Sequence, residues 1–160
     1  MVTLRLDEPS QSRFEAERRA HFPPGRTAVG AHATLFHALP GALGADATDR
    51  LAEVTERFAV RVAGVRSLGR GVAYELSCPP LESWHAQWQA QWREHLTRQD
   101  AQPLRLHVTV QNKVTPDEAR RTLELLRSGF SPWTARAVAL ELWEYLGGPW
   151  RPIRTFPLLG

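Results

Sequence analysis

The sequence of 160 residues has little cysteine and no long apolar run. Its one cysteine, Cys78, excludes an intramolecular disulfide and fits a reducing compartment. The longest apolar run is far too short to cross a bilayer, and the chain begins with an alternating strand pattern instead of a signal peptide. We therefore expect a cytoplasmic protein that does not associate with a membrane.

The sequence also lacks the usual signatures of a bound cofactor. No Gly-rich loop follows an expected strand, so nucleoside triphosphate hydrolysis has no support. No histidine occurs with His-x-x-x-His or Cys-x-x-Cys spacing or beside an acidic cluster, so we expect neither a structural zinc nor a two-metal site. The net charge of +3 is compatible with RNA but does not require it, because the arginines are scattered and many have acidic neighbours.

What the sequence does contain is a short motif that occurs twice. The tetrapeptide His-Ala-Thr-Leu at 32–35 recurs as His-Val-Thr-Val at 107–110. Chance would produce such a pair in β-prone surroundings with odds of roughly one in a hundred. Because side chains alternate between the two faces of a strand, each His and its Thr project from one face, about 7 Å apart. Two such strands would line one cleft with two imidazoles and two hydroxyls.

The elements expected around the two motifs also repeat. Both halves of the chain read strand, helix, His-x-Thr strand, helix, strand, and a final strand follows at about 150–158. With 42% hydrophobic and 23% charged residues, the composition is that of one globular domain. We expect a single domain over 1–160, with internal repeats at approximately 1–66 and 71–146. Strands are expected at 2–6, around 32–35, 60–65, 72–77, 104–110 and 135–145, and helices at 10–21, 46–58, 81–99 and 115–128.

The paired motifs, in a chain of this length and order, resemble the two-histidine phosphoesterase superfamily. That superfamily includes the bacterial 2′-5′ RNA ligase (LigT-like) proteins and cyclic phosphodiesterases. The resemblance rests on residues 31–40 (AHATLFHALP) and 107–113 (HVTVQNK) and spans nearly the whole chain. It implies a duplicated, bilobal α+β fold in which two antiparallel sheets form a central cleft, with helices outside and pseudo-two-fold symmetry. It also implies action on 2′,3′-cyclic phosphates or 2′-5′ linkages without a metal or other cofactor.

The four motif side chains suit this chemistry. Opening a cyclic phosphodiester requires a base to take a proton from water and an acid to protonate the departing ribose oxygen. Imidazole titrates near neutrality, so His32 and His107 can share the two roles, in an order that the sequence leaves open. Thr34 and Thr109 would donate hydrogen bonds to the phosphate oxygens. The reverse reaction would join a 5′-hydroxyl end to a cyclic phosphate.

Residues beyond each motif are candidates for contacts with the substrate. If the alternation continues, Phe36 shares a face with His32, whereas Gln111 and Lys113 share a face with His107. Phe36 would then stack on a base or pack in the cleft floor, and the other two would hold phosphate or a base edge. Lys113 is the only lysine of the chain.

Other conspicuous residues have a simpler structural interpretation. His37 has odd parity relative to His32 and should point to the opposite face, towards the helices. Trp84, Trp88 and Trp92 form a stripe along one helix, which indicates core packing in preference to a base-stacking platform.

Two loops could approach the mouth of the cleft. Arg26 precedes the first motif, and Trp150 and Arg151 belong to the last hairpin. Loops usually lie on the surface, so a solvated position is the simpler expectation for all three.

The leading interpretation is a phosphodiesterase that acts on a 2′,3′-cyclic phosphate at an RNA end or on a small nucleotide. We expect such a ligand as its partner and a monomer as its state. One alternative is a binding module that kept the cleft without turnover, although intact histidines and threonines in both motifs argue against it. Another is a phosphodiesterase for a metabolic cyclic phosphate that is not RNA.

Overall fold

Six antiparallel strands close into a ring, and a seventh extends it. The computed structural model describes residues 1–25 and 29–160. In ring order the strands are β1 (Val2–Leu6), β2 (Ala33–Phe36), β5 (His107–Gln111), β4 (Val72–Ser77), β3 (Phe58–Ser67) and β6 (Trp133–Tyr145), with β7 at Trp150–Pro157. The ring closes because β6 pairs with β1 as well as with β3, and β7 pairs with β6.

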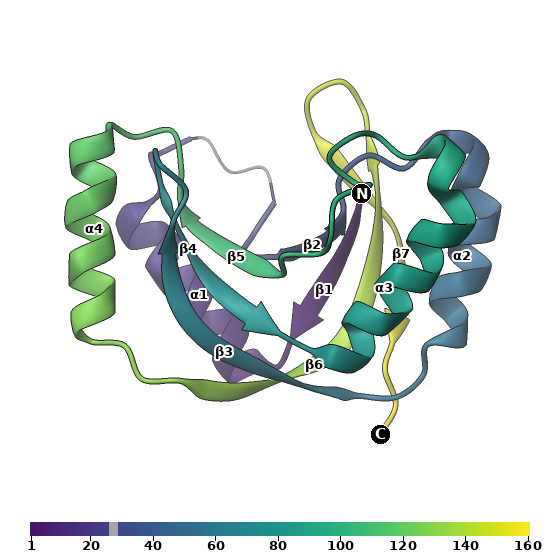
Figure 1. Cartoon of the computed structure of the whole chain (residues 1–160), viewed down its shortest axis with the longest axis horizontal. Coiled ribbons are helices and arrows are strands. Elements are labelled where there is room, and N and C mark those ends of the chain that lie inside the picture. The colour runs from purple at the N-terminus through teal and green to yellow at the C-terminus, as the bar shows by residue number, and fades with distance from the viewer. Residues whose placement is uncertain (26–28) are drawn as a thin grey trace.

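Four α-helices flank the strands. Figure 1 shows α1 (Glu8–His21) and α4 (Pro116–Ser128) on one side of the molecule, and α2 (Gly44–Glu53) and α3 (Pro79–Trp92) on the other. Short 3-10 helices lie at Gly41–Leu43 and Arg93–His95. Within the described part of the chain, no helix combines the length and the apolar character that a membrane crossing requires.

Local sequence signals account for several of these boundaries. The side chain of Thr115 accepts a hydrogen bond from the backbone N–H of Glu118 at 3.2 Å, which caps α4 where the Thr-Pro-Asp-Glu signal predicts a helix start. The β3–β4 hairpin turns at Gly69, whose φ of +82° favours glycine. The predicted order of elements is confirmed from β1 to β7.

The expectation of two separate sheets is wrong, because all seven strands belong to one sheet. The two halves of the chain are also interleaved: α1 packs against β5, and α4 packs against β3. A unit of about 70 residues buries little core by itself, so each half covers strands of the other. Exchanging β1, β2 and β3 with β4, β5 and β6 leaves every pairing of the ring unchanged.

Helix α3 contributes the predicted aromatic stripe to the core. Trp88 and Trp92 are buried, and their stacked rings have centroids 6.2 Å apart. The helix ends at Trp92. The sequence predicts an end near residue 99, so this boundary is wrong. Residues after the 3-10 turn fold back towards β2, where the Asp100 carboxylate accepts backbone hydrogen bonds. These tertiary hydrogen bonds outweigh the helical preference of the segment.

Candidate active site

The β2–β5 pair brings the two motifs together at the centre of the molecule. Ala33 is the partner of Val108 in an antiparallel register. Continuing that register places His32 opposite Thr109 and Thr34 opposite His107. The four motif side chains are half-buried, whereas the residues between them are buried, so the four share the open face of the strand pair. On such a pair the two histidines lie diagonally, roughly 7 to 8 Å apart at their α-carbons.

A backbone carbonyl group two residues earlier in the chain holds each motif histidine. Nδ1 of His32 lies 2.7 Å from the carbonyl oxygen of Gly30, and Nδ1 of His107 lies 2.6 Å from that of Arg105. A carbonyl oxygen can only accept, so Nδ1 carries the proton in both rings. In the neutral form the other ring nitrogen, Nε2, is then the basic atom. The two histidines therefore have the same tautomer.

The surroundings favour the neutral form of both imidazoles. Burial is the main cause that lowers the pKa of His32 from its ordinary value, and the nearby charges of Arg18 and His37 lower it further. Burial likewise lowers the pKa of His107, followed by the charges of Arg66 and His37. In each case the hydrogen bond to the backbone carbonyl opposes the shift without cancelling it.

The guanidinium of Arg66 lies close to the ring of His107. Its Nη2 lies 3.3 Å from Nδ1 of His107. A guanidinium can only donate, so this approach is an electrostatic contact while Nδ1 donates to Arg105. Arg66 also lies 3.7 Å from the Glu75 carboxylate, which holds it beside the ring.

A cavity of about 250 Å³ opens beside Thr34 and His107. His37, Arg66 and Arg105 also line it, so imidazole and guanidinium groups are its main charged side chains. Such donors suit an anion better than a metal cation. Further lining residues are Leu35, His85, Gln99, Asp100, Gln102, Pro103 and Leu104.

A bulge at the last residue of each motif changes which residues face this cavity. In the β1–β2 register, Thr3 pairs with Thr34 and Val2 with Phe36, so Leu35 is an extra residue. In the β4–β5 register, Val110 is skipped in the same way. A one-residue bulge shifts the alternation of faces, so the parity predicted from His32 and His107 fails beyond both threonines.

The predictions for Phe36 and Gln111 as contacts with the substrate are therefore wrong. Phe36 is 0% exposed, and its ring stacks on His85 of α3 with centroids 4.4 Å apart. Gln111 is 2% exposed, and its side-chain amide donates to Thr122 of α4 at 2.8 Å. Both side chains therefore face helices and not the cavity.

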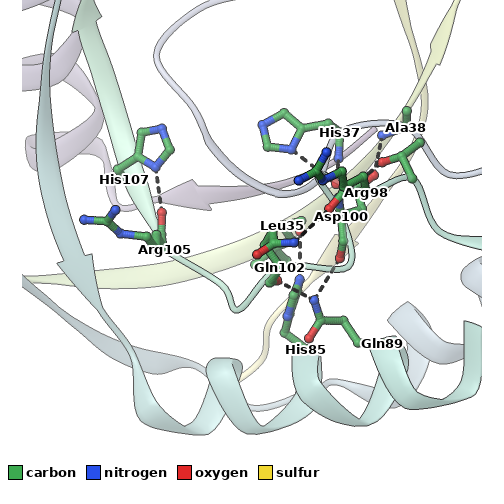
Figure 2. Close-up of polar contacts among 11 residues, drawn as sticks. Leu35, His37, Ala38, His85, Gln89, Arg98, Asp100, Gln102, Arg105 and His107 are labelled. Carbon is green, nitrogen blue, oxygen red and sulfur yellow. Dashed lines mark hydrogen bonds and ion pairs between the residues drawn. The ribbon is translucent and has the colours of Figure 1, made fainter. Parts of the chain in front are cut away.

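The same bulge turns His37 towards the cavity, so its predicted position among the helices is also wrong. Figure 2 shows the His37 ring on the side of the ribbon away from α3, where the ring of His107 also lies. The buried Asp100 carboxylate holds the loop: Oδ1 lies 3.2 Å from Nδ1 of His37, and backbone N–H groups of His37 and Ala38 donate to its two oxygens. His37 thus adds an imidazole to the lining of the cavity.

Lys113, another predicted candidate, lies apart from this cavity. Lys113 is exposed in the turn after β5, with a left-handed φ of 60°, and it does not line the cavity. Its contact with a ligand stays a prediction. Arg26 lies outside the described residues.

Sequence reasoning missed three residues at the site. Arg105 lies two positions before His107, and the same alternation that linked His107 with Thr109 could have indicated it. Arg66 and Asp100 had no sequence signal, because strand pairing and a loop that folds back bring them to the site.

Comparison with known families identifies the superfamily of the chain. A family model described as 2′-5′ RNA ligase superfamily matches residues 6–149. The chain belongs to this superfamily. A search of the curated proteins found no match.

Solved structures share the fold at low sequence identity. The structure of TT0787 from Thermus thermophilus superposes with a TM-score of 0.64 at 16% identity, over 98% of this chain and 96% of that one. Escherichia coli LigT complexed with 3′-AMP gives 0.63 at 15% identity, over 99% and 97%. The complex of LigT with NADP+ gives 0.61 at 19% identity, over 99% and 96%.

Proposed function

We propose that the protein is a metal-independent phosphodiesterase that opens 2′,3′-cyclic phosphates at RNA ends or on nucleotides. The observation that carries the proposal is the matched pair of imidazoles. His32 and His107 lie on one face of the β2–β5 pair, and in both the backbone leaves Nε2 as the basic atom. Membership of the 2′-5′ RNA ligase superfamily supports a phosphoester substrate.

In this mechanism the phosphate lies between the two histidines. One neutral imidazole takes a proton from water through Nε2, and the water oxygen attacks phosphorus. The other imidazole, protonated, gives the proton on Nε2 to the ribose oxygen that leaves on the opposite side. Each positioned acid or base contributes typically 10² to 10⁴-fold. Either ribose oxygen could leave, so the product is a 2′- or a 3′-phosphate.

Thr34 and Thr109 would hold the non-bridging oxygens of the phosphate. Each hydroxyl lies opposite a motif histidine when the β2–β5 register is continued. Hydrogen bonds that strengthen as negative charge develops on these oxygens favour the transition state. Arg66 and Arg105, which line the cavity beside Thr34 and His107, would add positive charge near the phosphate.

Binding of the phosphate would also set the protonation states of the two histidines that the reaction requires. Burial and neighbouring cations favour two neutral imidazoles in the free protein. A phosphate anion between the rings raises the pKa of both, because it stabilises the charged form. One histidine then gains the proton that it donates as an acid. Substrate binding thus prepares the catalytic pair.

The exchangeable pairing of the ring of strands suggests that the two histidines are nearly equivalent. Substrate orientation would then decide which is the acid. With a 5′-hydroxyl end in place of water as the nucleophile and the 3′ oxygen as the leaving group, the same two histidines would open the cyclic phosphate to give a 2′-5′ linkage. That ligation is a second activity of the proposed site.

The LigT complexes favour a nucleotide as ligand, and one of them broadens the choice. Their ligands are 3′-AMP and NADP+. A dinucleotide in the second complex keeps a metabolic nucleotide phosphodiester as a second candidate for this chain. A binding module without turnover is the third, and the paired basic nitrogens argue against it.

The test is turnover in the presence of a chelator. We would supply 2′,3′-cyclic nucleotides, a short RNA ending in a 2′,3′-cyclic phosphate and a 2′-5′-linked dinucleotide, and separate 2′- from 3′-phosphate products. Chelator-resistant opening of a cyclic phosphate supports the proposal. Absence of turnover with tight binding of these ligands would identify a binding module. If the protein neither cleaves nor binds any of them, the proposal is wrong.

A further inference from the structure

A second, larger cavity adjoins the proposed catalytic cavity. Its volume is about 490 Å³, within the range of roughly 300 to 1,000 Å³ that is common for small-molecule sites. It lies between the loop after β2 and the β6–β7 hairpin. His37 lines both cavities, so they adjoin at this residue.

The two cavities differ in chemistry. The smaller one presents imidazoles and guanidinium groups, whereas aromatic and aliphatic side chains dominate the larger one. Its one carboxylate, Glu144, is paired with Arg151. Its apolar lining includes Leu39, Leu142, Trp143, Tyr145, Trp150 and Ile153.

The β6–β7 hairpin presents an aromatic pair to this cavity. The rings of Tyr145 and Trp150 have centroids 4.9 Å apart at 44°. Tyr145 is 58% exposed and Ile153 is 54% exposed, so much of this apolar surface is open to solvent. Trp143 is fixed beside them, since its indole N–H donates to Thr3 at 2.9 Å.

We propose that this aromatic cavity binds the nucleobase of the substrate whose phosphate lies between His32 and His107. The inference deepens the proposed function and rests on it. A nucleotide joins an anionic group to a flat aromatic ring, and the two adjoining cavities offer a cationic and an aromatic half. Aromatic side chains stack on bases with little dependence on sequence. His37, held by Asp100, stands where the ribose connects the two parts.

The experiment compares two substrates that differ only in the base. Adenosine 2′,3′-cyclic phosphate carries it, and ribose 2,3-cyclic phosphate does not. Tyr145→Ala and Ile153→Ala should lower kcat/KM for the nucleotide at least tenfold more than for the base-free substrate. Tyr145→Phe should restore the preference, because it keeps the ring. Leu125→Ala removes an exposed side chain of α4 and is the matched control.

The outcomes separate this proposal from the proposed function. If both substrates are opened and the variants lose equally on both, the base subsite is wrong while the phosphodiesterase stands. If neither is opened, calorimetric binding of adenosine 3′-monophosphate to wild type and to Tyr145→Ala decides. Affinity that falls tenfold or more in the variant supports the subsite, and equal affinity or no binding overturns it.

A second copy of the chain is the other possible occupant of an exposed aromatic surface. Sedimentation at several concentrations tests this. Self-association that Tyr145→Ala abolishes would assign the surface to a dimer and overturn the base subsite. A monomer at all concentrations agrees with the proposal.

Discussion

His32 and His107 are held alike, each by a hydrogen bond from Nδ1 to the carbonyl oxygen two residues earlier, at 2.7 and 2.6 Å. The motif spacing alone does not require this match, because the partners are different residues, Gly30 and Arg105. In both motifs the carbonyl group two residues earlier sets the ring tautomer. The equivalence of the two rings has consequences that can be measured.

The tautomer itself is the first prediction. Above the pKa of each ring, the proton should reside on Nδ1 of both His32 and His107, because each carbonyl oxygen requires a donor. Long-range ¹H–¹⁵N spectra of the imidazoles distinguish the two nitrogens, and His32→Gln and His107→Gln assign the signals. Neutral rings protonated on Nε2 would contradict the mechanism, since that atom would then have no lone pair for the base.

Activity should depend on pH as a bell with its maximum on the acidic side. Burial, together with nearby cations, lowers the pKa of both histidines from 6.5. The base must be neutral and the acid protonated, so kcat/KM should be highest below about pH 6.5 and fall above it. The alkaline limb of kcat should lie at higher pH, because bound phosphate raises both pKa values. A rate that climbs to a plateau above neutrality would count against this assignment.

Removing one motif hydroxyl should affect turnover more than binding. Thr34→Val keeps the shape of the side chain and removes the donor, and loss of one such donor costs about 10² to 10³ in kcat. Thr34→Ser keeps the hydroxyl and should retain most of the rate. The same pair of changes at Thr109 should give matching results. Single-turnover rates of the four variants check this, and a Val variant as active as its Ser counterpart would exclude the hydroxyl from the reaction.

Asp100→Ala should destabilise the loop that carries His37. The carboxylate accepts backbone N–H groups of His37 and Ala38 at 2.7 and 2.8 Å, and Asp100 is 3% exposed. A buried donor left without an acceptor costs about 1 to 3 kcal/mol, so the free energy of unfolding should fall by at least that amount. Urea denaturation measures it. An unchanged midpoint would mean that water replaces the carboxylate.

The pKa of Asp100 also predicts how the free energy of unfolding changes at low pH. Burial alone would raise the pKa of Asp100, but the combined hydrogen bonds from His37 and Ala38 lower it from 3.8. A depressed folded-state pKa stabilises the fold above the unfolded value and loses that contribution as pH falls through the folded one. The difference in the free energy of unfolding between wild type and Asp100→Ala should therefore become smaller below about pH 3.8.

The sequence predicted the order of elements and the shared face of each motif because both depend on local patterns. The alternation from His32 to Thr34 extends over one pleat, and strand geometry determines it. The parity failed one residue later, at Leu35, and again at Val110. A bulge depends on pairing with the neighbouring strand, and no residue type at either position signals it.

Local sequence patterns could not predict that the ring closes or that His37 lines the cavity, because both depend on contacts between distant parts of the chain. Periodicity identifies β1 and β6 as strands but does not say that they pair with each other. His37 reached the cavity through the bulge, and Asp100 reached His37 because the chain leaves α3 early and folds back. Asp100 and His37 are 63 positions apart in the chain.

The most direct test of the central claim is a double-mutant cycle on His32 and His107, with a chelator present and a 2′,3′-cyclic nucleotide as substrate. His95→Ala, which changes an exposed histidine outside the described cavities, is the control. The two-histidine account predicts that each Ala variant loses about 10² to 10⁴-fold in kcat. The kcat of the double variant should be only a little lower than that of the less active single variant, because both rings act on one transition state. A single variant that keeps the wild-type rate would contradict the account.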